Sequence, residues 1–157
     1  MTMTNSISPI GVIRTPFKSK AECPVQGVSA QGALGQVEVY PEFQEGLLDI
    51  ESFSHVYLLY QFHLAGEVKL VRTPFLDETR HGLFATRHPC RPNGIGLSIV
   101  RILGREGGVL SVQDVDMIDQ SPLIDIKPYV PKFDARPDAN NGWVEVDDFS
   151  LKPSGRE

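Results

Sequence analysis

The sequence predicts a mainly β protein, a small closed or partly open β-barrel with one short helix. At least six short runs are rich in β-branched and aromatic residues or alternate between apolar and polar positions, as strands do. Glycine and proline separate these runs, and one segment has helical spacing. Many short strands with little helix are typical of a barrel or a sandwich.

We expect residues 1–157 to form a single β-barrel domain, because a chain of 157 residues can build one hydrophobic core. Residues 132–157 are rich in proline, aspartate and asparagine, and they are expected to form an extended C-terminal tail. Within this tail, Trp143–Val146 is a possible last strand.

The first half of the chain contains three predicted strands. Residues 10–13 are a β-branched run, and residues 36–40 alternate between apolar and polar side chains. The polar residues 18–35 between them indicate a long loop. Residues 53–63 are almost continuously apolar, which favours a central buried strand.

A short amphipathic helix is predicted over residues 42–52. Phe43, Leu47 and Ile50 are three or four positions apart, so a helix would place them on one face toward the core.

The second half of the chain adds four further runs. Residues 68–72 and 82–86 flank a polar connection. Residues 96–103 and 109–115 are separated by the glycine-rich segment 104–108, a pattern typical of a β-hairpin.

The charge of the chain is unevenly distributed. Its net charge of -5 argues against indiscriminate binding to nucleic acid. Residues 69–105, in contrast, carry seven basic residues and two acidic ones, a net charge of +5. This basic segment indicates a local surface for an anion, provided that the residues stay together in the fold.

Other sequence features limit the class of protein. No apolar run approaches the roughly 20 residues of a membrane helix, and the N-terminus lacks the pattern of a secretory signal, so we expect a cytoplasmic protein without membrane contact. The two cysteines, Cys23 and Cys90, are too few for a disulfide framework and lack zinc-site spacing. We expect free thiols and no bound metal.

The segment 84–97 has the composition of a shaped binding loop. It contains two arginines, two prolines, Asn93 and two glycines between apolar runs. Arginine binds carboxylates and phosphates, proline restricts the backbone, and glycine allows close approach to a ligand. The loop can therefore hold a small anionic or zwitterionic molecule. Alternatively, Asn93-Gly94 is a simple hairpin turn and the arginines are solvated.

Four aspartates form a second dense patch around a predicted turn: Asp114, Asp116, Asp119 and Asp125. They could accept hydrogen bonds from a cationic ligand and orient the arginines of the preceding loop, or bind a hard divalent metal. Capping of the turn is the alternative. Metal binding is the weakest interpretation, because no ligand-spaced motif is present.

Two histidines lie in the apolar run 53–63. A histidine in such a run is more often a hydrogen-bonded core residue than a ligand, and His55 fits that description. His63 stands at the end of the run and is the better functional candidate.

Four ordered motifs between about Ile10 and Pro131 carry a family resemblance. They are Arg14-Thr-Pro-Phe17, Gly46-Leu-x-x-Ile-x-x-Phe-Ser-His55, Phe84-Ala-Thr-Arg-x-Pro-x-Arg-Pro-Asn-x-Ile-Gly-Leu-Ser98 and Asp125-Ile-Lys-Pro-Tyr-Val-Pro131. Together they resemble the family of S-adenosylmethionine-dependent methyltransferases that methylate N6 of threonylcarbamoyladenosine next to the tRNA anticodon.

This resemblance implies an enzyme with a small β-barrel, a homodimer with S-adenosylmethionine near the subunit interface, and tRNA as substrate. Gly94 stands where the family usually has proline, which makes the loop more flexible, but glycine permits most backbone angles and cofactor binding should survive.

The resemblance and the two dense patches together give a set of expected site residues. Arg87 and the run 93–97 are expected to contact the methionine and ribose end of the cofactor, and residues 116–119 the adenosine. The expected cofactor-binding residues are Gln26, His63, Arg87, Asn93, Gly96, Leu97, Asp116, Met117, Ile118 and Asp119. Arg72, Arg80 and Arg91 are expected to contact RNA phosphate or the subunit interface.

No catalytic residue is assigned, because a sulfonium already activates its methyl group and the protein mainly has to align the reactants. An aspartate, a histidine or solvent could take the proton that leaves the attacked nitrogen.

Two alternative functions fit the same residues. One is a noncatalytic β-barrel that binds S-adenosylmethionine or a nucleotide as a sensor. The other is an RNA-binding or protein-interaction module without a cofactor.

Overall fold

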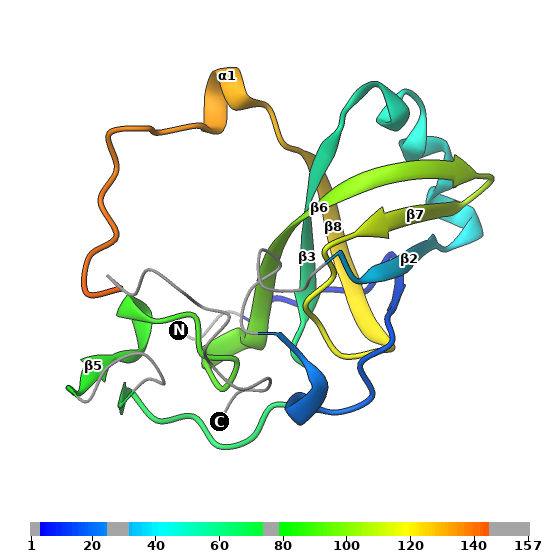
Figure 1. The fold of residues 1–157 in the computed structure, drawn as a ribbon. Helices are drawn as coiled ribbons and strands as arrows, with labels where there is room; N and C mark the ends of the chain where they lie inside the picture. The colour runs from blue at the N-terminus through cyan, green and yellow to red at the C-terminus, as the bar shows by residue number, and fades with distance from the viewer. Residues whose placement is uncertain (1–3, 25–31, 74–78, 145–157) are drawn as a thin grey trace.

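In the computed structural model, which describes residues 4–24, 32–73 and 79–144, six antiparallel strands close a barrel in the order β1-β2-β7-β6-β3-β8 (Figure 1). The barrel strands are β1 (Gly11–Arg14), β2 (Leu34–Val39), β3 (His55–Gln61), β6 (Ile95–Glu106), β7 (Val109–Gln113) and β8 (Ser121–Pro128). The predicted mainly β barrel is therefore confirmed.

The barrel interior is the hydrophobic core, and the alternation of side chains along each strand explains why. On β3, Val56, Leu58 and Tyr60 point inward and are 0%, 0% and 2% exposed. Val100 on β6 and Leu110 on β7 are also fully buried and belong to the same cluster. Because successive side chains of a strand face opposite sides, the other half of each strand forms the outer wall.

Two predicted strands lie outside the barrel. The segments 68–72 and 82–86 contribute only β4 (Val71–Arg72) and β5 (His81–Gly82), which pair with each other in a two-stranded sheet. The predicted hairpin at the glycine-rich segment 104–108 does form, between β6 and β7.

The predicted short amphipathic helix over residues 42–52 is present as 3-10 helix, but Phe43 is 43% exposed and does not face the core as expected. Two 3-10 helices occupy this segment, η3 (Pro41–Leu47) and η4 (Ile50–Ser52), and Asp49 between them has a left-handed backbone with φ 70°. Leu47 and Ile50 still face the core, at 3% and 9% exposed. Three-residue spacing suits a 3-10 helix as well as an α-helix, so the apolar pattern was compatible with both.

Strand β8 was not predicted, because its sequence was interpreted as part of a turn rich in aspartate. The turn exists in residues 114–120, where Asp114 and Gln120 have φ values of 75° and 69°. The strand follows directly, and its prolines, Pro122 and Pro128, lie near its two ends, where proline is tolerated best.

The short 3-10 helices η1 (Lys20–Glu22), η5 (Leu83–Ala85) and η6 (Pro92–Gly94) and the helix α1 (Pro131–Asp134) complete the described elements. Beyond α1, residues 135–142 are exposed and form an arm that returns to the vicinity of β5 (Figure 1). Trp143 and Val144 are not in a strand, and the rest of the possible strand Trp143–Val146 lies outside the described residues.

Across the described ranges, no helix is both long enough and apolar enough to cross a membrane.

Candidate functional site

A pocket lies where β3 ends, and the chain that follows this strand forms one of its walls. The space in and around the pocket is about 420 Å³, a figure that includes open solvent, so the pocket is a shallow one. Its first wall consists of Tyr60, Phe62, His63, Leu64 and Ala65. This wall is mostly aromatic and apolar.

The opposite wall comes from the turn between β7 and β8. It contributes Asp116, Met117 and Ile118, together with Ser121 at the start of β8. Asp116 is 5% exposed and Met117 is 3% exposed, so this wall belongs to the barrel interior rather than to a surface loop. Lys20, Cys23 and Pro89 complete the lining.

Three side chains connect the two walls through a buried chain of hydrogen bonds. The Ser98 hydroxyl donates to Oδ1 of Asp116 over 2.5 Å, and the hydroxyl of Tyr60 lies 2.9 Å from Oγ of Ser98. Because Ser98 has one proton and gives it to the carboxylate, Tyr60 must be the donor in the second bond. These two hydrogen bonds fix the positions of Tyr60, Ser98 and Asp116 in the pocket wall.

Gly96 allows the aromatic wall to pack against β6. A Cβ at this position would overlap the ring of Tyr60 and lie 2.9 Å from Cζ of Phe62. The two rings meet edge to face, with centroids 5.5 Å apart. Only glycine leaves room for this arrangement, because the missing side chain is where the rings lie.

The lining suits a ligand that is apolar in the middle and charged in both senses. Most of the exposed lining is apolar, and Asp116 and Lys20 are the two lining residues of carboxylate and ammonium type. The rings of Tyr60 and Phe62, with Met117, present apolar surface to a flat group such as a nucleobase. These groups can bind and orient a zwitterionic nucleoside derivative.

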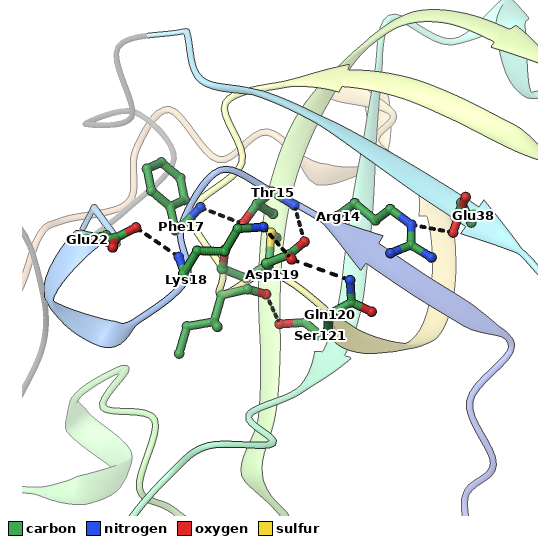
Figure 2. A network of polar contacts seen from close by, with 11 residues as sticks. Arg14, Thr15, Phe17, Lys18, Glu22, Glu38, Asp119, Gln120 and Ser121 are labelled. Carbon is green, nitrogen blue, oxygen red and sulfur yellow. Dashed lines mark hydrogen bonds and ion pairs between the residues drawn. The ribbon is translucent and has the colours of Figure 1, made fainter.

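Asp119 is close in sequence but has a structural role (Figure 2). It accepts hydrogen bonds from the backbone N–H of Thr15 at 2.9 Å, from Nζ of Lys18 at 2.6 Å and from the amide of Gln120 at 3.4 Å. Burial raises the pKa of Asp119, but the bonds from Lys18 and the other two donors outweigh it and hold the pKa below its ordinary value. Asp119 thus joins the end of β1 to the turn before β8.

Of the ten predicted cofactor residues, the structure brings four together in the pocket: His63, Asp116, Met117 and Ile118. Gly96 lies directly behind the aromatic wall and supports it. Gln26 lies outside the described residues.

Leu97 points away from this pocket. It is 56% exposed on the outer face of β6, whereas its neighbours Gly96 and Ser98 face the interior. Leu97 and Asp116 therefore lie on opposite sides of the barrel wall.

The arginine loop touches the pocket through Pro89. Asn93 and Gly94 both have left-handed backbones, with φ values of 66° and 54°, as the Asn-Gly turn interpretation expects. Arg87 and Asn93 are exposed and do not line the pocket. The loop thus combines a turn with an edge of the pocket, but the turn is not a hairpin, because β5 pairs with β4 while β6 pairs with β3 and β7.

The three arginines predicted to contact RNA differ in their surroundings. Arg80 is exposed. Arg72 is half-buried and donates to the Glu67 carbonyl at 2.7 Å. Arg91 donates from one nitrogen to the carbonyls of Thr86, at 2.9 Å, and His88, at 3.3 Å. Their role in RNA binding stays a prediction.

Sequence reasoning missed Tyr60, Phe62, Lys20 and Ser98. Tyr60 had a signal: it is in phase with Val56 and Leu58, the inward positions of β3. The sequence contains no signal for Ser98, because Ser98 meets Asp116 only when the barrel has closed. Among the residues described here, no group of three or more histidine, cysteine or carboxylate side chains is placed to hold a metal ion.

Comparisons with known proteins agree with this geometry. A family model described as the tRNA-methyltransferase O N-terminal domain matches residues 12–135. A protein of Pyrococcus abyssi named as a probable S-adenosyl-L-methionine-binding protein is 52% identical over 144 residues, which are 92% of this chain and 78% of the relative.

The tRNA (adenine(37)-N6)-methyltransferase of Escherichia coli K12 is 34% identical, over 87% of this chain and 62% of that enzyme. The crystal structure of TrmO from Pseudomonas aeruginosa has a TM-score of 0.78 and 43% sequence identity, and it covers 93% of this chain and 64% of the crystallised one. This chain therefore spans less than two thirds of the length of these two bacterial relatives.

Proposed function

Since this chain belongs to the tRNA-methyltransferase O family of S-adenosylmethionine-dependent enzymes, we propose that it transfers a methyl group from S-adenosylmethionine to N6 of an adenosine in tRNA. The resemblance in its motifs supports threonylcarbamoyladenosine next to the anticodon as the nucleoside. A tRNA substrate also accords with the cytoplasmic location expected from the sequence.

One observation carries this proposal: Asp116 and Lys20 line the same pocket as the aromatic residues Tyr60 and Phe62. S-adenosylmethionine combines an adenine ring, an ammonium, a carboxylate and a sulfonium. Asp116 fits a cationic group or a hydroxyl donor of this molecule, Lys20 fits its carboxylate, and Tyr60 with Phe62 fits a flat ring. The residues present therefore suit this cofactor.

When bound, S-adenosylmethionine supplies a methyl group that its sulfonium has already activated. The residues of the chain then have to orient the target nitrogen and exclude water. Such alignment can lower a barrier by about 7–11 kcal/mol without a covalent nucleophile. The apolar wall of Tyr60, Phe62 and Met117 excludes water, and the Tyr60-Ser98-Asp116 chain keeps the carboxylate in one orientation.

The attacked nitrogen must lose a proton. Asp116 and His63 both line the pocket and are the acceptor types suited to this step. The measurement that distinguishes them is the pH dependence of kcat in Asp116→Asn and His63→Gln variants.

A homodimer is the second part of the proposal, and the outer face of β6 supports it. Ile95, Leu97, Ile99 and Leu103 are 38%, 56%, 43% and 51% exposed along one side of this strand. Leu59 on β3 pairs with Leu97 and widens the apolar strip. A second copy of the chain would cover this face.

An isologous contact of this kind would cover Leu97 with the same face of the second copy. Leu97 would then be an interface residue and would lie outside both pockets.

The test starts with calorimetric titration of S-adenosylmethionine into purified protein, with one site per subunit expected. Methyl transfer is then measured on tRNA that carries N6-threonylcarbamoyladenosine and on the same tRNA with unmodified adenosine. Only the modified tRNA should accept the methyl group. Folded protein that does not bind S-adenosylmethionine at millimolar concentration would contradict the proposal, and binding without transfer to either tRNA would indicate a sensor.

A further inference from the structure

The loop that follows β5 presents an aromatic ring to solvent on a fixed backbone. Phe84 is 77% exposed, while its neighbour Leu83 in the same 3-10 helix is 1% exposed. Leu83 therefore anchors the helix η5, and the ring of Phe84 is directed outward from a position that packing holds in place.

Arg91 supports this ring from one side. Its guanidinium carbon lies 5.9 Å from the centroid of the Phe84 ring, a cation-π contact. Hydrogen bonds to the carbonyls of Thr86 and His88 hold the same guanidinium in place. The ring and the arginine thus form a preorganised pair.

A second stacked pair lies beside the first. The rings of His81 and Trp143 are 4.4 Å apart and nearly parallel, at 15°. Nε1 of Trp143 donates to the carbonyl of Ala85, which directly follows Phe84, at 2.8 Å. The arm after α1 is therefore attached next to Phe84, as its return toward β5 in Figure 1 shows.

Three of the four residues in these pairs belong to a basic segment of the sequence, whereas Trp143 has acidic neighbours such as Asp138 and Glu145. Between residues 79 and 105 the chain has no aspartate or glutamate, and it has Arg80 and Arg87 on either side of Phe84. Both arginines are exposed. A basic surface on a chain of net charge -5 is complementary to a polyanion.

We propose that Phe84, backed by Arg91, is a stacking platform for a base of single-stranded RNA. This inference rests on the proposed function, because it concerns the nucleotides beside the methylated adenosine. Single-stranded RNA is recognised by stacking its unpaired bases on aromatic side chains while cations follow the phosphates. The loop provides both groups.

The position of the platform suits a neighbour of the reacting nucleotide. Pro89 lines the pocket and is two residues from Arg91, so their Cα atoms are at most about 7 Å apart. A base stacked on Phe84 would therefore lie near the mouth of the pocket.

A second copy of this chain is a poorer occupant of the same surface. A two-fold contact through Phe84 would bring Arg80 and Arg87 of one subunit against the same residues of the other, which like charges oppose. The outer face of β6 carries one exposed arginine, Arg101, but four exposed apolar side chains lie in phase with it, so this face suits a second copy better.

The experiment compares Phe84→Ala, the conservative variant Phe84→Tyr and the control Phe133→Ala. Phe133 is also largely exposed, at 64%, but lies on α1. Binding is measured by fluorescence anisotropy with an anticodon stem-loop RNA and with whole tRNA. Phe84→Ala should weaken RNA binding roughly 5- to 100-fold, the usual effect of losing one stacked base, while the other two variants should stay within about twofold of the wild type.

Two further measurements test whether RNA binds beside Phe84 and separate the platform proposal from the methyltransferase proposal. Trp143 is the only tryptophan of the chain, so its emission reports directly on the neighbourhood of Phe84 and should change when RNA binds to the wild type. S-adenosylmethionine affinity should be the same in all variants.

Normal RNA binding by Phe84→Ala would overturn the platform and leave the methyltransferase proposal intact. A change of oligomeric state in Phe84→Ala would also overturn it, since the ring would then belong to a subunit contact. Wild-type protein that binds S-adenosylmethionine but no RNA would overturn both the platform and the tRNA substrate.

Discussion

The hydroxyl of Ser98 on β6 donates a 2.5 Å hydrogen bond to Oδ1 of Asp116 in the turn between β7 and β8. Both residues are 5% exposed, so the carboxylate is held inside the barrel and not at its rim. The strand that crosses the barrel thus fixes the one acidic group that lines the pocket.

Removal of the hydrogen bond between Ser98 and Asp116 should destabilise the protein more than removal of the hydrogen bond between Tyr60 and Ser98. Ser98→Ala removes a hydrogen bond to a buried carboxyl group, and we expect the free energy of unfolding to fall by about 1.5–3 kcal/mol. Tyr60→Phe removes a bond between two neutral hydroxyls and should cost about 0.5–1.5 kcal/mol. Urea denaturation measures both, and equal losses would contradict the proposed direction of donation.

Gly96→Ala should disrupt the aromatic wall. The new methyl group would overlap the ring of Tyr60, and overpacking of this kind typically costs about 1–3 kcal/mol. We also expect weaker binding of S-adenosylmethionine by calorimetry. Gly104→Ala is the matched control on the same strand, because nothing lies within 4 Å of its added Cβ. Equal effects of the two substitutions would show that space at Gly96 is unimportant.

The ion pair of Asp119 with Lys18 should make part of the stability dependent on pH. The pKa of Asp119 is lowered in the folded protein, so its contribution is present above the pKa of the unfolded chain and is lost as pH falls through the folded value. Asp119→Asn should therefore be less stable than the wild type at pH 7, and the difference should shrink below about pH 4. Urea denaturation from pH 7 to pH 3 would measure this difference, and a constant gap would be inconsistent with the lowered pKa.

Arg87 and Arg80 should affect different ligands. From the sequence, Arg87→Ala is expected to weaken S-adenosylmethionine binding by about 1.5–3 kcal/mol, the usual value of a hydrogen bond with a charged group. Because Arg87 does not line the pocket of its own chain, this loss requires that Arg87 of a second copy reaches the cofactor. Arg80→Ala should leave cofactor binding unchanged, lower tRNA affinity and reduce the slope of log affinity against log salt by about one. Cofactor titration and tRNA binding at several salt concentrations test both variants. The reverse pattern would mean that the two roles are exchanged.

Charge on the outer face of β6 should dissociate the dimer. Leu97→Lys and Ile99→Lys each place an ammonium in the apolar strip, and light scattering should then give a mass near the 17.4 kDa of one chain. Leu34→Lys on β2 is the control, because Leu34 is 62% exposed and lies elsewhere on the barrel. If the wild type is already a monomer at micromolar concentration, the homodimer proposal fails.

The parts of the fold that depend on local pattern could be predicted from the sequence. The apolar run of β3 and the glycine-rich hairpin between β6 and β7 both formed as expected. Strand β8 could not be recognised in this way, because its prolines and aspartates are typical of turns and its pairing with β1 joins opposite ends of the chain.

In the site, too, some residues could be predicted from local pattern and others depend on pairing between distant strands. Asp116, Met117 and Ile118 are contiguous, so one motif could identify all three. Ser98 and Tyr60 become neighbours of Asp116 only through the register of β3 on β6, in which Tyr60 lies opposite Gly96. Register depends on the closed barrel, and no local pattern contains it.

The barrel closes between β1 and β8, with Gly11 opposite Leu123. During synthesis, therefore, β1 has no partner on that side until more than a hundred further residues have been made. The pairing of such distant segments is slow, because the entropy of a long loop is lost before the contacts form. Until then an open strand edge and apolar residues such as Ile13 are available to other chains, so we expect folding of a nascent molecule to finish late and to depend on protection from aggregation.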